Sequence, residues 1–377
     1  MTTRLADALR RRIATTGPVT VAAFMAEALA HPTLGYYRRA RAVGADGDFT
    51  TAPEISQMFG ELVGAWLAER WIAMDRPAPV RLVELGPGRG TLMADALRAT
   101  RGVAGFHDAL SLHFVEIDAT LRESQRAALE RHRPVWHERF DDAPDDAPLL
   151  LVANEFLDAL PTRQLVRAPF GWAERMVGLA SDGRFVFALA PGPSPLAPLV
   201  PADIAADARP GSVVEISTAA RALAAAVAGR VARRRGAALI VDYGYDCGTH
   251  GDTLQALRRH AKIDVFDSIG EADLTTHVDF AAVAAAARAA GAVVDGPAGQ
   301  GDFLEALGIA TRAAALKRHA SPAQAAGIDA AARRLIAPDQ MGTLFRALAL
   351  RDPATPPSPG FAAGAHRHSS TPDGTEP

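Results

Sequence analysis

The feature that most constrains this chain is a short apolar run that ends in alternate glycines. Residues Val80–Leu85 lead into Gly86, Gly88 and Gly90, and the helical pattern of Thr91–Arg101 follows. Glycine permits a sharp turn and the close approach of a ligand to the backbone, and the helix that follows begins with unpaired N–H groups and positive potential. The pattern therefore predicts a strand, a ligand-binding loop and a helix.

Three further apolar runs predict that this strand belongs to a parallel sheet. The runs are Leu112–Ile117, Leu149–Ala153 and Ala237–Val241, and helical patterns follow the first strand and the run Leu112–Ile117. Strands that alternate with helices form βαβ units, whose sheet is covered on both faces. We also expect a short strand at Pro134–Arg139 and a last, antiparallel strand at the sheet edge over Thr343–Leu350. The predicted fold class is α/β with a mostly parallel sheet.

Changes of pattern along the chain divide it into four regions. Pro77-Ala78-Pro79 ends a helical N-terminal region, and short apolar segments separated by turn residues interrupt the α/β pattern after residue 162. The expected regions are an N-terminal helical or lid region (1–76), an α/β core (77–162 and 235–351, with a helical insertion at about 246–318), an inserted β-hairpin or substrate region (163–234) and a disordered tail (352–377).

Composition excludes several classes of function. Forty basic and 43 acidic residues give a formal charge of −3, which provides no electrostatic reason to expect nucleic acid as a partner. No run of about 18 apolar residues is present, so we expect no membrane insertion. Cys247 is the only cysteine and the histidines lack metal-ligand spacing, so we expect no metal site. We expect a cytoplasmic protein of bacterial type, or one of the mitochondrial matrix if the source is eukaryotic.

The spacing of the glycines separates two classes of nucleotide-binding loop. A dinucleotide fingerprint needs its third glycine where Thr91 stands, so an oxidoreductase is disfavoured. The E-x-G-x-G-x-G form, with Glu84, Gly86, Gly88 and Gly90, resembles motif I of class I S-adenosylmethionine-dependent methyltransferases. The resemblance implies S-adenosyl-L-methionine as the cofactor, and the alternative is a tight turn that binds nothing.

Acidic residues at the ends of the next strands could complete the cofactor site. Glu116 ends the second apolar run about one βαβ unit after the glycines, where a carboxylate can accept hydrogen bonds from both ribose hydroxyls. The alternative is a solvated acid, and Asp118 is expected to cap the next helix instead. Asp141 could meet the adenine amino group, but it stands in an acidic loop that offers an equally good solvated position.

Longer motifs in the same order resemble one family, the MidA-like methyltransferases. The motifs that carry the resemblance are Gly35-Tyr36-Tyr37, Gly44, the stretch from Gly47 to Glu61, the glycine loop, Ala153–Pro161, Val241–Tyr245 and Ala272–Phe280. The match runs from about residue 17 to 350. It implies a Rossmann-like methyltransferase core with an N-terminal helical region and insertions. It also implies, from the mitochondrial members, symmetric dimethylation of an arginine on a respiratory complex I subunit, hence a protein substrate; a homodimer is left open.

Within that core, Asn154, Glu155 and Asp158 are the candidate catalytic residues. Asn154 and Glu155 directly follow the third apolar run, at the end of a central strand where ligands bind in open α/β sheets. A carboxylate can grip two nitrogens of a guanidinium and orient the third, so Glu155 is the first candidate and Asp158 the second. Asn154 could hold the cofactor or the target nitrogen. In the alternative reading, Asn154 or Glu155 only caps the next helix.

The polar N-terminal motif offers a second wall for the cofactor. Thr50, Thr51 and Ser56 are the candidates for lining the pocket as part of a lid that excludes water. The alternative is a plain helix start with Pro53 in its first turn. Two other functions stay open for the whole chain: an assembly chaperone for complex I with dispensable catalysis, and a small-molecule methyltransferase.

Overall fold

The computed structural model describes residues 3–38, 51–246 and 251–361. In its central sheet, seven strands lie side by side in one hydrogen-bonded order. The strands in spatial order are β15 (Val293–Gly299), β16 (Phe345–Arg351), β10 (Gly236–Tyr245), β5 (Leu149–Asn154), β2 (Val80–Leu85), β3 (Leu110–Val115) and β4 (Val135–His137), and β14 (Val278–Asp279) pairs with β10. The pairs from β10 to β4 are parallel, and β16 runs antiparallel to both of its neighbours. Every residue of β5 is buried, as expected of a strand covered on both faces. The predicted α/β fold is confirmed.

The edge of this sheet differs from the prediction. The last strand, β16, is antiparallel as expected, but β15 lies outside it and forms the edge. Strand β15 falls within residues 246–318, for which the alanine-rich sequence predicts a helical insertion. Val293 and Val294 instead pair with Arg351 and Leu350, because the adjacent strand offers backbone partners that a local pattern does not reveal.

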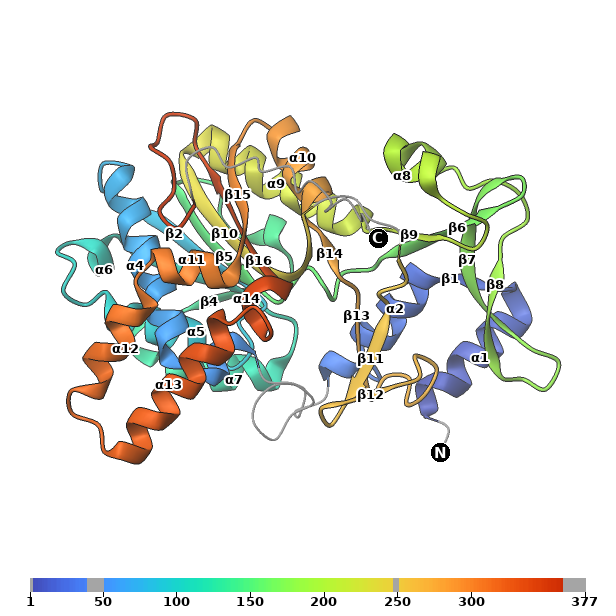
Figure 1. Cartoon of the computed structure of the whole chain (residues 1–377), viewed down its shortest axis with the longest axis horizontal. Coiled ribbons are helices and arrows are strands. Elements are labelled where there is room, and N and C mark those ends of the chain that lie inside the picture. The colour runs from blue at the N-terminus through green and yellow to red at the C-terminus, as the bar shows by residue number, and fades with distance from the viewer. Residues whose placement is uncertain (1–2, 39–50, 247–250, 362–377) are drawn as a thin grey trace, which may run out of the picture.

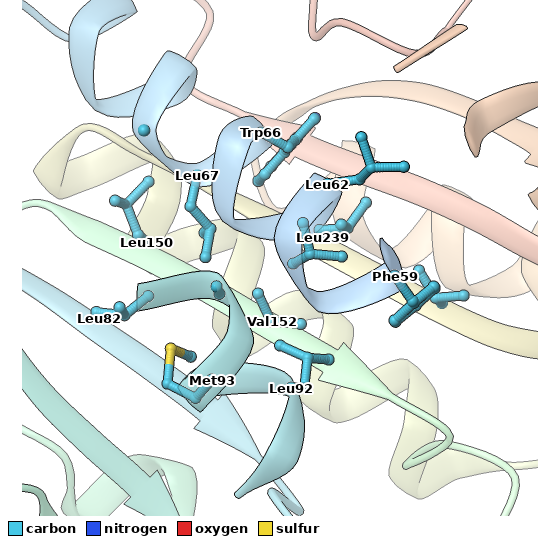
Figure 2. Close-up of a cluster of buried hydrophobic side chains, with 14 of the residues drawn as sticks. Phe59, Leu62, Trp66, Leu67, Leu82, Leu92, Met93, Leu150, Val152 and Leu239 are labelled. Carbon is cyan, nitrogen blue, oxygen red and sulfur yellow. The ribbon is translucent and has the colours of Figure 1, made fainter. Parts of the chain in front are cut away.

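Helices cover both faces of the sheet (Figure 1). One face packs against α3 (Ala52–Ile55), α4 (Gln57–Ala73), α5 (Thr91–Ala99), α6 (Phe106–Ala109), α11 (Gln300–Ala306), α12 (Ile309–Lys317), α13 (Pro322–Ile336) and α14 (Met341–Leu344). The other packs against α9 (Thr218–Arg234) and α10 (Phe280–Ala289). Figure 2 shows the first layer, in which Phe59, Leu62 and Trp66 of α4 lie over strand residues such as Val152 and Leu239.

Two helices that the expected regions place outside the α/β core therefore belong to it. Helix α4 packs on the central sheet although it lies within residues 1–76, and α9 does so although it lies within 163–234. A helix with apolar residues on the face toward a sheet joins that sheet wherever it occurs in the chain. Both helices are part of the α/β core.

A second body packs beside the carboxyl end of the central strands. It contains α1 (Arg4–Thr16), α2 (Val21–Ala30), the 3₁₀ turn η1 (Tyr36–Arg38), a five-stranded sheet of β1 (Val19–Thr20), β6 (Arg163–Ala168), β7 (Gly171–Leu179), β8 (Phe185–Leu189) and β9 (Val213–Ile216), and a three-stranded sheet of β11 (Gln255–Arg258), β12 (Ala261–Ile263) and β13 (Asp273–Thr275). The short helix α8 (Ala202–Asp207) packs on the larger sheet. The expected helical insertion at 246–318 is thus wrong for residues 255–279, which contain the strands β11, β12, β13 and β14.

The segment after β16 is ordered as far as the described residues extend. Asp352, Thr355 and Ser358 are buried, and Phe361 packs against Phe303 of α11. The prediction of a disordered tail is wrong for residues 352–361; residues 362–377 lie outside the described part of the chain. Among the described residues, no helix is both long and apolar enough to cross a membrane.

Candidate active site

A cavity of about 300 Å³ lies where the central strands end and the second body begins. Four neighbouring strands contribute to its wall in their spatial order: Glu138 follows β4, Glu116 follows β3, the glycine loop follows β2 and Asn154 ends β5. The described residues that line it, called here the cavity wall, are Ala26, Leu29, Ala30, Tyr37, Thr51, Pro53, Glu54, Glu84, Gly86–Arg89, Thr91, Leu92, Val115–Ile117, Leu121, Glu138, Asn154–Phe156 and Ala159–Pro161. Ligands of open α/β sheets bind at this edge.

The three glycines of the loop differ in their position relative to the cavity. Gly86 and Gly88 belong to the cavity wall, with φ values of 61° and 53°. A Cβ at Gly86 would come 2.7 Å from Cδ2 of Phe156, so both the backbone conformation and the space demand glycine there. Gly90 is not in the wall: it has φ 83°, precedes α5 and faces Gln125. Gly90 therefore packs α5 against the helix that contains Gln125, and its contact with the cofactor stays a prediction.

Glu84 brings an unpaired carboxyl oxygen into the wall. The residue is 3% exposed, and its Oε2 has no hydrogen-bond partner among the described residues. Burial raises the pKa of Glu84 to about 8. A buried acid without a partner is costly, and a cation placed beside it would remove that cost.

Glu116 is held in place by the helix that follows it, α7 (Ala119–Ala128). Its Oε1 accepts from the N–H of Asp118 at 2.8 Å and its Oε2 from Nε2 of Gln125 at 3.2 Å. The same Nε2 donates to the carbonyl of Gly88 at 2.7 Å, so Gln125 joins the acid to the glycine loop. Asp118 caps α7, as predicted. Sequence analysis missed Gln125, because a glutamine within a helix gives no signal of the loop that it reaches.

The structure places Asp141 away from the cavity, so its predicted contact with adenine is wrong. The Asp141 side chain is 67% exposed and lies 3.6 Å from Arg139 in a surface ion pair. Glu138 occupies the wall instead, directly after β4. The predicted strand, Pro134–Arg139, is longer than the observed one, and this excess hid Glu138 as the acid at its end.

Asn154 and Glu155 both line the cavity at the end of β5. Oε1 of Glu155 accepts from the N–H of Ala52 at 3.2 Å and from Nδ2 of Asn154 at 3.1 Å. Glu155 has φ 49°, and no helix follows it, so the alternative of a helix cap is wrong. Burial and the nearby Asp158 raise the pKa of Glu155 to about 8. The buried Oδ1 of Asn154 has no partner among the described residues.

Asp158 lies behind the wall rather than in it. Its Oδ2 accepts from the hydroxyl of Tyr243 at 2.5 Å, and its Oδ1 has no partner in the described part of the chain. Burial raises the pKa of Asp158 to about 6. Tyr243 is outside the wall, and its ring packs edge-on against His277 and Phe345.

Asp242 of β10 holds the whole loop that contains these residues. Its Oδ2 accepts from three successive backbone N–H groups, those of Phe156, Leu157 and Asp158, at 2.8–3.3 Å. Its Oδ1 accepts from the N–H of Tyr243. Sequence analysis did not select Asp242, although its position at the end of an apolar run, next to the strand of Glu155, is the signal that could have found it.

Of the two predicted residues of the N-terminal motif that the structure describes, one lies in the wall. Thr51 lines the cavity, whereas Ser56 caps α4 by accepting from the N–H of Met58 at 3.2 Å. Thr50 lies outside the described residues. Glu54, one turn into α3, is also in the wall and accepts from the hydroxyl of Thr91 at 2.5 Å.

The wall as a whole is acidic. Among the described residues, Arg89 is the single basic residue of the wall, and five glutamates line it: Glu54, Glu84, Glu116, Glu138 and Glu155. No group of three or more potential metal ligands occurs within residues 3–38, 51–246 and 251–361. Gly86 and Gly88 turn the backbone at the cavity with positive φ, and the unpaired oxygen of Glu84 suits a cationic ligand. These features fit S-adenosyl-L-methionine, which carries positive charge.

A mostly parallel sheet with this cradle at its carboxyl edge defines a class I methyltransferase. Residues 62–298 match the family of S-adenosyl-L-methionine-dependent methyltransferases, and the chain belongs to that family. It is a methyltransferase that uses S-adenosyl-L-methionine.

Full-length relatives support this assignment. The chain is 37% identical to the mitochondrial protein arginine methyltransferase NDUFAF7 homolog of Drosophila melanogaster, over 92% of this chain and 84% of that protein. It is 36% identical to human NDUFAF7, over 81% and 73% of the two chains. A crystal structure of a Burkholderia thailandensis protein bound to S-adenosyl-homocysteine superposes with a TM-score of 0.83 at 30% identity, covering 97% of this chain and 96% of that one.

Proposed function

We propose that this methyltransferase modifies arginine side chains of a protein. The observation that carries the proposal is the carboxyl of Glu155, fixed in the cavity wall at the end of β5 beside Asn154 and Asp158. The relatives named above as protein arginine methyltransferases support the same substrate class. The acidic wall suits a guanidinium, which stays protonated at neutral pH.

The residues of the chain would supply orientation and charge to this reaction. S-adenosyl-L-methionine, when bound, provides an electrophilic methyl group on a sulfonium. Glu84 and Glu116 would hold its charged and ribose parts. Glu155 would accept two N–H bonds from the guanidinium and direct the remaining nitrogen toward the glycine loop, while Asn154 would use its free Oδ1 as a further acceptor.

The proton balance gives Glu155 a second task. The target nitrogen gains a methyl group and loses a proton, and the Glu155 carboxylate is the acceptor that we assign to that proton. Asp158, behind the wall and bonded to Tyr243, would act through its charge. The Thr51 side chain would close the wall opposite the glycine loop.

A subunit of respiratory complex I is the substrate that we propose within this class. The same proposal places a bacterial form of the protein in the cytoplasm and a eukaryotic form in the mitochondrial matrix, in keeping with the mitochondrial relatives. A homodimer stays a prediction that the molar mass in solution can decide.

Replacing the Glu155 carboxylate is the direct test of this function. Glu155→Gln keeps the acceptor for the Ala52 N–H but loses the charge, so we expect kcat/KM for arginine methylation to fall about 10- to 100-fold, the range of one charge-assisted hydrogen bond. Transfer of tritiated methyl to complex I subunits measures the rate, and calorimetric titration with S-adenosyl-homocysteine should show unchanged cofactor binding.

Glu123→Gln is the matched control, because that glutamate is exposed on α7 and outside the cavity wall. Equal rates for both variants and the wild type would refute the assigned role of Glu155. If Glu155→Gln lost methyl transfer yet still restored complex I assembly in cells, the assembly function would be independent of catalysis.

A further inference from the structure

The cavity has a chemically distinct end that neither the glycine loop nor the strand-end acids explain. Helix α2 contributes Ala26, Leu29 and Ala30 to the wall, at the i, i+3 and i+4 spacing of one helix face. Phe24, Met25 and Ala28, on the other side of the same helix, are buried in the core of the second body, so the helix is anchored there.

The position of α2 assigns its face to the substrate half of the cavity. Along the sheet, the wall runs from Glu138 and Glu116 through the glycine loop to Glu155. Helix α2 packs on β6 and β13, and β6 starts two residues after Pro161, at the end of the loop that begins with Glu155. Figure 1 shows α2 beside β11 and β13, away from α7 and β4. Ala159, in the loop that begins with Glu155, packs against the same apolar cluster as α2, so the α2 face adjoins that loop.

The chemistry of this end is apolar and its residues are small. The opposing wall residues are Ala159, Leu160 and Pro161, so the space between α2 and the loop is bounded by hydrocarbon. Alanines one turn apart on α2 leave a passage where larger side chains would fill it. The acidic Glu155 lines the same cavity as this passage.

We infer that the α2 face of Ala26, Leu29 and Ala30 is the wall along which the target side chain enters, and that it selects an unbranched hydrocarbon stem with a cationic tip. The stem would exchange water for the apolar walls, while the tip would meet Glu155. This inference rests on the proposed function and deepens it, because it explains how a long protein side chain reaches the methyl group.

A single added side chain on α2 tests the passage. Ala26→Leu keeps a good helix former and fills the space, so we expect methyl transfer to fall at least tenfold with unchanged binding of S-adenosyl-homocysteine. Ala30→Leu, at an exposed position of the same face, should act in the same direction and carries less risk to folding. Ala22→Leu is the matched control, one turn before Ala26 and outside the cavity wall.

The assay measures tritiated methyl transfer to two nonapeptide mixtures, one with a central arginine and one with a central lysine, and titrates each variant with S-adenosyl-homocysteine by calorimetry. Loss of transfer in Ala26→Leu and Ala30→Leu, with Ala22→Leu equal to wild type, supports the inference. Weaker binding of S-adenosyl-homocysteine in these two variants overturns it, since α2 would then face the cofactor.

Different results would refute the inference about α2 and the proposal that the protein methylates arginine. If the wild type methylates arginine peptides and Ala26→Leu and Ala30→Leu do so equally well, the inference fails and the proposed function stands. If the wild type methylates only lysine peptides and the α2 variants lose that activity, the arginine proposal fails and the passage is supported. A wild type that labels neither mixture counts against both.

Discussion

At the scale of single residues, the site depends on acids that the fold keeps from water. Glu84 and Glu155 both have a pKa near 8, chiefly because they are buried. An acid whose pKa rises from 4.5 on folding binds its proton more tightly in the folded state. The folded state therefore loses stability as pH rises from about 4.5 to about 8. The ionised carboxylates of these two glutamates would attract a bound cation, which offsets the stability that the ligand-free protein loses.

Glu84→Gln should reveal that cost. The amide stays neutral, so we expect the ligand-free variant to melt at a higher temperature than the wild type at pH 8.5, with a gain of roughly 1 to 3 kcal/mol, and to show little gain at pH 4.5. Binding of S-adenosyl-L-methionine, measured by calorimetry at pH 8.5, should weaken in the same variant. A gain in stability that is the same at both pH values would show that Glu84 does not titrate as described.

At the scale of elements, the helix after the glycine loop is positioned by close contact with α4. Gly60 and Gly64 of α4 face α5, and a Cβ at Gly64 would lie 2.5 Å from the carbonyl oxygen of Ala96. Such a contact is possible only for glycine, so the two helices approach along their backbones. The close approach fixes α5, whose first residues, Thr91 and Leu92, line the cavity.

Gly64→Ala should separate these helices and destabilise the protein. Because the obstructing atoms are backbone, we expect a loss of about 2 to 4 kcal/mol, seen as a lower midpoint of urea unfolding. Gly327→Ala is the control: it makes the same change inside α13, where nothing lies within 4 Å of the new Cβ, and should stabilise by up to about 1 kcal/mol. Equal midpoints for the two variants would contradict the packing argument.

At the scale of the whole molecule, segments far apart in the sequence meet around the core. One example is Arg70 of α4, 1% exposed, which donates to the carbonyls of Pro356 and Pro357 at 2.8 and 3.2 Å. These bonds tie the segment after the last strand to the helix that covers the central sheet. The cavity wall likewise combines segments that are far apart in the sequence, namely α2, α3 and the ends of β2 to β5.

Arg70→Met should release this C-terminal attachment. Methionine fills much of the volume but leaves both proline carbonyls without their donor, so we expect a loss of about 1 to 3 kcal/mol and faster amide exchange over residues 352–361. Hydrogen exchange followed by mass spectrometry checks the position of the change. Arg101→Met, at an exposed arginine, should leave exchange of that segment as in the wild type.

What the sequence determined by itself was local or periodic. Neighbouring residues alone predict the strand, the glycine loop and the helix that follow residue 80. The strand ends place Glu116, Asn154 and Glu155 at a common edge of the sheet, because parallel strands all point the same way. The helix cap at Asp118 follows from the same short-range chemistry.

Tertiary structure alone decided which of several plausible groups meet. Glu138 replaced Asp141, Asp158 turned behind the wall toward Tyr243, and β15 formed where alanine-rich sequence favoured helix. Neither Gln125 nor the α2 face carried a sequence signal. In each case the outcome depends on a partner tens or hundreds of residues away, and only packing of the complete chain sets that distance and burial.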